Sequence, residues 1–110
     1  MSLKVKFLEK VSKNEDINYD NYFKVVFTSS ILINDKKIDF KFTEEDGMGV
    51  TLEIKDDNNY KKVSREDNFE YLFIEELFCQ SPIDFESIIE GEEIELNFDY
   101  YEDDGIIEFY

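Results

Sequence analysis

Four stretches in the first half of the chain alternate apolar and polar residues, which is the period of a β-strand with one buried face. They cover about residues 3–7, 23–33, 38–42 and 50–54. Residues 12–20 are polar and predict a loop between the first two strands. Because the last three stretches follow one another closely, we expect them to form an antiparallel meander.

Turn residues separate the strands of this meander. The tetrapeptide "NDKK", residues 34–37, predicts a hairpin with Asp35 and Lys36 as its two loop residues. This register pairs Ile33 with Ile38 and keeps both apolar sets on one face. The glycine-containing stretch "EEDGMG" predicts the next turn, and "DDNN" is expected to end the fourth strand.

A helix is predicted over residues 65–79, where apolar residues recur at helical spacing. Ser64 and Asp67 lie three residues apart and resemble a capping box at its start. Pro82 follows the last apolar residue of the pattern, a position that suits the end of a helix. Residues 83–90 are ambiguous between a loop and a short helical turn.

The C-terminal residues predict two more strands. From Glu93 to Tyr100 the chain alternates acidic or amide side chains with apolar ones. Asp104 and Gly105 form one of the strongest short hairpin signals, and a two-residue loop there would pair Tyr100 with Phe109. The apolar faces of the two strands then coincide, and the acidic side chains share the other face.

These elements predict one α+β domain over residues 1–110, with the order β-β-β-β-α-β-β. We expect an antiparallel sheet, curled and rich in meander connections, with one main helix packed on its apolar face. The hydrophobic share of 42% is sufficient for an ordinary core.

The charge distribution is uneven. The formal net charge is −16, and residues 1–65 hold 12 acidic and 12 basic groups, whereas residues 66–110 hold 16 acidic groups and no basic one. The excess of acid therefore lies entirely in the last part of the chain. A charge run of this kind is either a solvated face that serves solubility or a surface that meets a basic partner.

Several features bear on location and origin. Residues 1–13 alternate charged and apolar side chains and lack the apolar run of a signal peptide. The longest apolar run, residues 71–74, is too short to cross a bilayer, so we expect no membrane association. The single cysteine, Cys79, fits a reducing cytoplasm and is interpreted as a small apolar residue near a helix end. Abundant Lys, Asn, Ile and Phe without Ala indicate the AT-rich genome of a bacterium or phage.

Catalytic and cofactor chemistry lacks its usual residues. The chain has no histidine to activate Cys79, and its glycines at 47, 49, 91 and 105 match no phosphate-binding loop. We expect no enzymatic activity, no cofactor and no metal site, since one Cys without His does not make a zinc site and the loop at Gly105 fails the calcium pattern. Nucleic-acid binding is disfavoured because phosphates would be repelled.

The acidic stretch near the C-terminus is the candidate functional surface. By strand parity, Glu93, Glu95, Asp99 and Glu108 are expected on one face. Together with the hairpin loop, the candidate partner-binding residues are Glu93, Glu95, Asp99, Tyr101, Glu102, Asp103, Asp104 and Glu108. Tyr101 is either an exposed anchor or a cross-strand cover for Tyr110, opposite Glu108.

This profile predicts a small acidic, non-enzymatic inhibitor or antidote whose carboxylate face binds a basic surface of a nucleic-acid-acting protein, such as a nuclease toxin. In size and charge it resembles bacterial immunity proteins and phage anti-restriction or anti-CRISPR proteins, with no shared motif. The alternative is a small α+β domain that binds a small ligand or forms a homodimer through its C-terminal edge strand.

Overall fold

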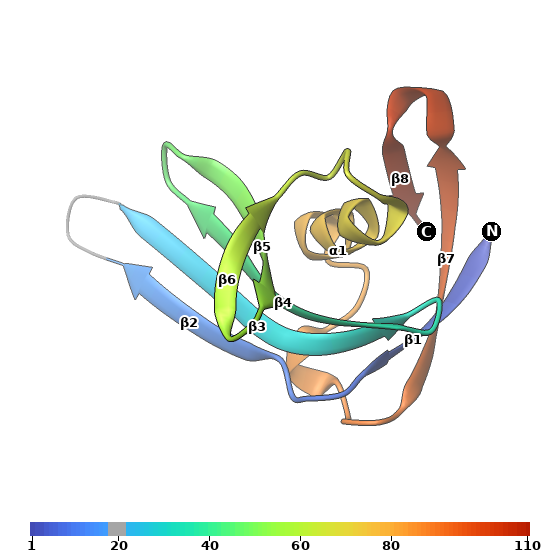
Figure 1. Ribbon diagram of the computed structural model, residues 1–110, viewed down its shortest axis with the longest axis horizontal. Coiled ribbons are helices and arrows are strands. Elements are labelled where there is room, and N and C mark those ends of the chain that lie inside the picture. The colour runs from blue at the N-terminus through green and yellow to red at the C-terminus, as the bar shows by residue number, and fades with distance from the viewer. Residues whose placement is uncertain (18–21) are drawn as a thin grey trace.

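A curved antiparallel sheet wraps around one helix in the computed structural model, which describes residues 1–17 and 22–110 (Figure 1). The strands are β1 (Ser2–Phe7), β2 (Ser12–Ile17), β3 (Phe23–Ile33), β4 (Lys36–Glu45), β5 (Gly49–Asp56), β6 (Asn59–Val63), β7 (Glu93–Tyr101) and β8 (Ile106–Phe109). The helices are α1 (Phe69–Gln80) and the short 3-10 turns η1 (Phe85–Ser87) and η2 (Glu102–Asp104).

The predicted α+β class is confirmed: the described residues form an open sheet of eight strands and one main helix. The strand order is β6-β5-β4-β3-β1-β7-β8, and β2 also pairs with β3. Because β1 lies between β3 and β7, the N-terminal strand joins the meander to the C-terminal hairpin. Every pair of neighbouring strands is antiparallel.

Two strands were not predicted. The loop expected over residues 12–20 is wrong for its described part, because residues 12–17 form β2, a fully exposed strand on β3. Residues 18–20 of that loop lie outside the described residues. A strand with water on both faces needs no apolar alternation, so its sequence carries no period-two signal. The stretch "DDNN" does end β5, but Asp57 and Asn58 then adopt positive φ angles of 48° and 70° and return the chain as β6.

Aromatic side chains of α1 fill the concave side of the sheet. Phe73 is fully buried and meets Phe98 and Phe109 edge to face, with ring centroids 5.6 and 5.3 Å apart. Near the other end of α1, Phe78 stacks on Phe85 of η1 at 4.2 Å. The helix therefore ties β7 and β8 to the rest of the core, and each buried aromatic contributes about 2 kcal/mol or more of hydrophobic stabilisation.

The first hairpin has the predicted faces and a different register. Its loop residues are Asn34 and Asp35, both at positive φ (51° and 63°), and Ile33 pairs with Lys36 rather than with Ile38. A tight turn of this type requires left-handed backbone at both loop positions, which Asn and Asp tolerate better than Lys. Since the shift is two residues, the apolar faces of β3 and β4 still coincide.

Helix α1 begins at Phe69, four residues later than predicted, because Asn68 is its N-cap and accepts a hydrogen bond from the amide of Tyr71. Asp67 does accept a hydrogen bond from the amide of Ser64, but within a turn that precedes the helix. The ambiguous residues after α1 contain the 3-10 turn η1. Among the described residues, no helix is long and apolar enough to span a membrane.

Candidate partner-binding surface

The hairpin β7–β8 displays the acidic residues on the face that points away from α1. All eight candidate residues are exposed. Inward-pointing Phe98 and Ile107 are buried, so the alternation along both strands leaves the carboxylates in water. The predicted acidic face is therefore present as a surface, and its parts differ in what surrounds them.

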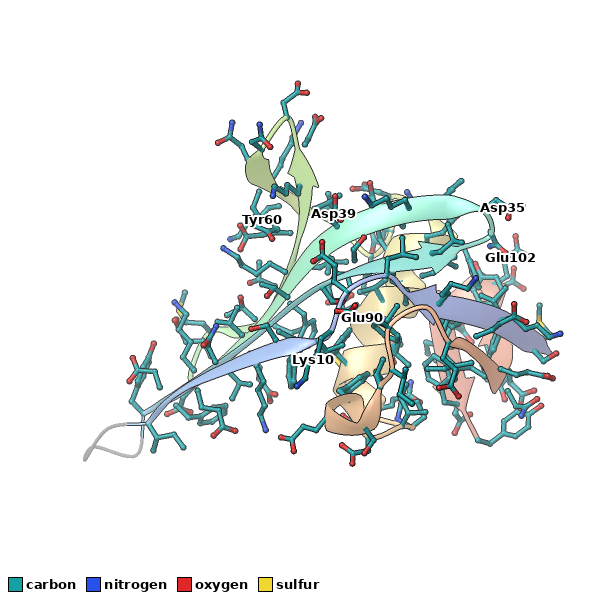
Figure 2. All side chains as sticks on the ribbon, turned by 90° about the horizontal axis from the view of Figure 1, so that it is seen from below. Lys10, Asp35, Asp39, Tyr60, Glu90 and Glu102 are labelled. Atoms are coloured by element: carbon teal, nitrogen blue, oxygen red, sulfur yellow. The ribbon has the colours of Figure 1, made fainter. Side chains whose placement is uncertain are left out.

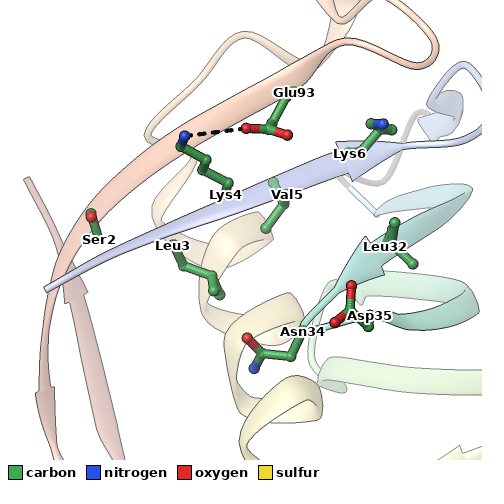
Figure 3. A pocket seen from close by; sticks show the side chains of 9 residues that line it. All are labelled: Ser2, Leu3, Lys4, Val5, Lys6, Leu32, Asn34, Asp35 and Glu93. Carbon is green, nitrogen blue, oxygen red and sulfur yellow. Dashed lines mark ion pairs between the residues drawn. The ribbon is translucent and has the colours of Figure 1, made fainter.

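Glu93 and Glu95 face lysines of the neighbouring strand. In the β1–β7 register Lys6 lies opposite Glu93 and Lys4 opposite Glu95. The Lys4 ammonium also lies 3.5 Å from a Glu93 carboxylate oxygen, as Figure 3 shows. These two carboxylates are thus partly neutralised within the protein, although each such exposed pair contributes little to stability.

The remaining acidic residues of the hairpin have no lysine opposite them. Asp99 and Glu108 lie directly opposite each other on β7 and β8, and like charges in that position repel. Glu102, Asp103 and Asp104 follow in the connecting loop. Among the described residues, none of these five carboxylates forms an ion pair. We call these five residues the uncompensated acidic patch.

Exposed apolar side chains surround this patch on the same face. Tyr101 and Ile106 lie opposite each other, each 46% exposed, and Tyr110 is 73% exposed. The predicted pairing of Tyr101 with Glu108, and with it a cover over Tyr110, is wrong, because the loop spans four residues with Gly105 left-handed at φ 62° rather than two. Tyr101 is therefore an exposed aromatic beside Ile106.

Arg65 anchors the loop of this hairpin to the helix. Its guanidinium donates a hydrogen bond to the carbonyl of Gly105 at 3.2 Å and forms an ion pair with Glu76 at 2.8 Å. The same side chain lies 3.5 Å from a carboxylate oxygen of Glu75, which is otherwise buried without a hydrogen bond. Desolvation by burial raises the pKa of the Glu75 carboxyl and outweighs the opposite effect of Arg65.

Gln80 occupies the outer edge of the last strand. Its amide nitrogen donates to the carbonyl of Ile107 at 2.6 Å, and its amide oxygen accepts from the backbone N–H of Phe109 at 2.9 Å. The side chain thus imitates a neighbouring strand over one residue pair. A homodimer through this edge, the alternative derived from the sequence, would have to displace Gln80 first.

A surface groove of about 530 Å³ runs beside the uncompensated acidic patch. It brings together Tyr101, Asp104 and Glu108 of the candidate residues, with Glu76 and Ile106 beside them. Carboxylates next to an aromatic ring and an aliphatic side chain suit the long stem and charged head of a lysine or arginine. The other candidate residues, on the strands and in the loop, lie outside this groove.

Glu93 lines a second crevice, of about 580 Å³, between β1 and the turn at Asn34 and Asp35 (Figure 3). Lys4 and Lys6 line it as well, so its charges are mixed. Since α1 fills the concave side of the sheet, the hollows of the described residues that the structure shows are at the surface. No group of three or more His, Cys, Asp or Glu side chains among the described residues is arranged to hold a metal ion.

Cys79 lies near the end of α1 with an exposed side chain, which differs from the apolar role expected from the sequence. Desolvation of its sulfur and the nearby carboxylates of Glu76 and Glu75 raise the pKa of the thiol to about 11. A thiol with such a pKa is a poor nucleophile at neutral pH.

The sequence did not identify the residues that organise this surface. Lys4 and Lys6 were not recognised because the strand next to β7 was unknown, and nothing in the sequence marks Gln80. Arg65 carried one signal, since it is the single arginine of the chain. Comparisons with known proteins found no matching family model, no similar curated protein and no similar solved structure.

Proposed function

We propose that this protein is a small, non-enzymatic inhibitor or antidote that binds a basic surface of a nucleic-acid-acting protein through the uncompensated acidic patch. The observation that supports the proposal is the like-charge pair Asp99–Glu108 between exposed Tyr101, Ile106 and Tyr110. In size and charge such a protein resembles immunity, anti-restriction and anti-CRISPR proteins. Elsewhere on the sheet, Glu15 and Glu45 form ion pairs with Lys13 and Lys24.

Repulsion within the free protein favours such a complex. Two carboxylates about 6 Å apart repel by about 0.7 kcal/mol in water, and salt at physiological strength roughly halves this. A basic partner removes the repulsion and replaces it with attraction. The charge also accelerates association, and the exposed tyrosines add contact area.

Glu93 and Glu95 are expected to contribute less than their position suggests. Their lysine neighbours on β1 reduce the local potential, and a partner would have to compete with Lys4 for Glu93. We therefore assign the contact to Asp99, Glu108 and the loop residues Glu102, Asp103 and Asp104, with Tyr101 as the aromatic anchor.

The test compares two triple variants with equal charge. Asp99→Asn/Asp103→Asn/Glu108→Gln removes three charges from the uncompensated acidic patch. Asp46→Asn/Asp56→Asn/Asp57→Asn removes three exposed carboxylates from the β4–β5 and β5–β6 turns and serves as the control. Each protein is immobilised, exposed to an extract of the host cells and eluted with salt, and the protein retained by the wild type is then purified.

The purified partner is titrated with all three proteins by calorimetry at several salt concentrations, and its activity on nucleic acid is assayed with and without them. We expect the patch variant to bind at least about tenfold more weakly, with a smaller salt dependence and weaker inhibition. The control variant should match the wild type. Equal affinity of the patch variant and the wild type would contradict the proposal.

A further inference from the structure

Strand β2 has an open outer edge beside the part of β3 that β1 does not cover. Its residues pair with β3 on one side, and no backbone hydrogen bond from residues 12–17 to another described segment is present. All six residues are exposed. Figure 2 shows β2 extending away from the helix along the border of the molecule. An edge of this kind presents unpaired N–H and C=O groups to any strand that fits it.

The strands at the two ends of the sheet order, β8 and β6, have protected edges. Gln80 bonds to Ile107 and Phe109 along the outer edge of β8. Strand β6 carries Lys61 and Lys62 at its centre, and antiparallel pairing of two copies of this strand would bring lysines close together. Lysine on an edge is a common protection against strand pairing.

The charges of β2 complement those of a second β2. In an antiparallel pair centred on Asn14, Lys13 of each copy lies opposite Glu15 of the other, and Ser12 lies opposite Asp16. Lys13 and Glu15 share one face of the strand, where they already form an ion pair at 2.9 Å within one chain. Residues of equal parity pair in this register, so the two sheets join with their concave sides facing the same way.

We propose that two copies of this protein associate through their β2 strands, in antiparallel register centred on Asn14, to form a two-fold symmetric dimer with a continuous sheet. The register centred on Asn14 places no like charges opposite each other. Moving its centre to Lys13 or to Glu15 would instead set two lysines or two glutamates face to face. Symmetric pairing of one surface with itself closes the assembly at two copies.

The acidic hairpin does not oppose this contact. In Figure 1, β2 and the pair β7–β8 lie at opposite ends of the longest axis, which measures 42 Å. The Debye length is about 8 Å at physiological salt, so the acidic residues of one copy are screened from those of the other. The dimer leaves the uncompensated acidic patch exposed, and it does not depend on the proposed function.

A six-residue strand pair buries less surface than a standard interface of roughly 1,600 Å². We therefore expect reversible association at protein concentrations between about 10 µM and about 1 mM, as for weak interfaces. The variants used below change only exposed residues of β2 and none of the core. A change in their association constant therefore reports on the β2 contact.

The experiment is sedimentation equilibrium of the full chain, over that concentration range in about 0.15 M salt, with the wild type, Lys13→Glu, Glu15→Lys and the double swap. The wild type is expected to approach twice its monomer mass of 13.2 kDa. Each single variant sets two like-charge pairs across the interface and should associate at least about tenfold more weakly. The double swap restores opposite charges and should regain the wild-type association constant.

A mixture of the two single variants supplies the control. Neither associates well alone, but in a mixed dimer the two glutamates of the Lys13→Glu copy meet the two lysines of the Glu15→Lys copy. The mixture should therefore associate like the wild type. Circular dichroism confirms that each variant is folded. Monomeric wild type at about 1 mM overturns the dimer. Unimpaired association of Glu15→Lys overturns the register centred on Asn14.

Discussion

Two glutamates of the same hairpin should respond in opposite directions to the same substitution. Glu108 lies opposite Asp99, whereas Glu93 lies opposite Lys6 and 3.5 Å from Lys4. Glu108→Lys turns a repulsive cross-strand pair into an attractive one, and Glu93→Lys does the reverse. Each variant changes the formal net charge of −16 by the same two units, so a difference between them arises from local pairing.

The expected size follows from the register. Side chains directly opposite on antiparallel strands have Cβ atoms about 5 Å apart, which places the charged groups at about 6 Å. At that separation one pair contributes about 0.7 kcal/mol in water. Reversing its sign therefore changes the free energy of unfolding by about 1 kcal/mol at low salt, a gain for Glu108→Lys and a loss for Glu93→Lys.

Urea unfolding followed by circular dichroism measures this difference at about 0.02 M and about 1 M salt. The two variants should differ by about 2 kcal/mol at low salt and by little at high salt, where the Debye length is about 3 Å. Equal shifts of both variants in the same direction would refute the local argument, because net charge alone would then determine the stability.

The other predictions concern the groups that hold the hairpin and the two perturbed side chains. Gln80→Ala should lower the free energy of unfolding by about 1–2 kcal/mol and speed hydrogen exchange of the Phe109 amide, whereas unchanged protection of that amide would argue against the edge contact. Phe73→Ala should cost about 3–5 kcal/mol in urea unfolding, since the ring is fully buried, and a cost below about 1 kcal/mol would contradict the packing. Because burial raises the pKa of Glu75 in the folded state, the wild type loses stability as the pH rises above the ordinary value of 4.5. The free energy of unfolding of Glu75→Gln, measured relative to the wild type, should therefore increase between about pH 3.5 and pH 7. A difference between the two proteins that is constant with pH would refute this. Cys79, with a pKa of about 11, should react with iodoacetamide at pH 8 at least about tenfold more slowly than an ordinary thiol, and a pH profile centred near 8.5 would exclude the shift.

The faces of the strands were predictable, and their registers were not. In both hairpins the observed register differs from the predicted one by two residues, as shown by Ile33 opposite Lys36 and Tyr100 opposite Ile107. A period of two makes registers two residues apart equivalent for burial, so the apolar pattern does not distinguish them. Turn conformation decides instead, through left-handed Asn34 and Asp35 in one case and Gly105 in the other.

The order of the strands in the sheet could not be predicted from the sequence, for a related reason. Hydrophobic alternation shows that β1 and β7 each bury one face, but it carries no information about which strand lies beside which. That order decides whether an acid is compensated, because Glu93 and Glu95 owe their lysine neighbours to the position of β1. The sequence therefore predicted the exposed carboxylates correctly and treated as equivalent two groups that the structure separates.

The hairpin tolerates the repulsion on its outer face because packing of its inner face stabilises it. Phe98 and Phe109 pack against Phe73, and Arg65 and Gln80 attach the loop and the outer edge to α1. Burial of these aromatic rings contributes several kcal/mol, whereas the repulsion between Asp99 and Glu108 costs less than about 1 kcal/mol. The inner face thus stabilises the geometry in which the outer face is repulsive. If the inner contacts were weakened, the carboxylates of the acidic patch would move apart. Less repulsion would then be relieved when a basic partner binds, and the binding free energy would be smaller.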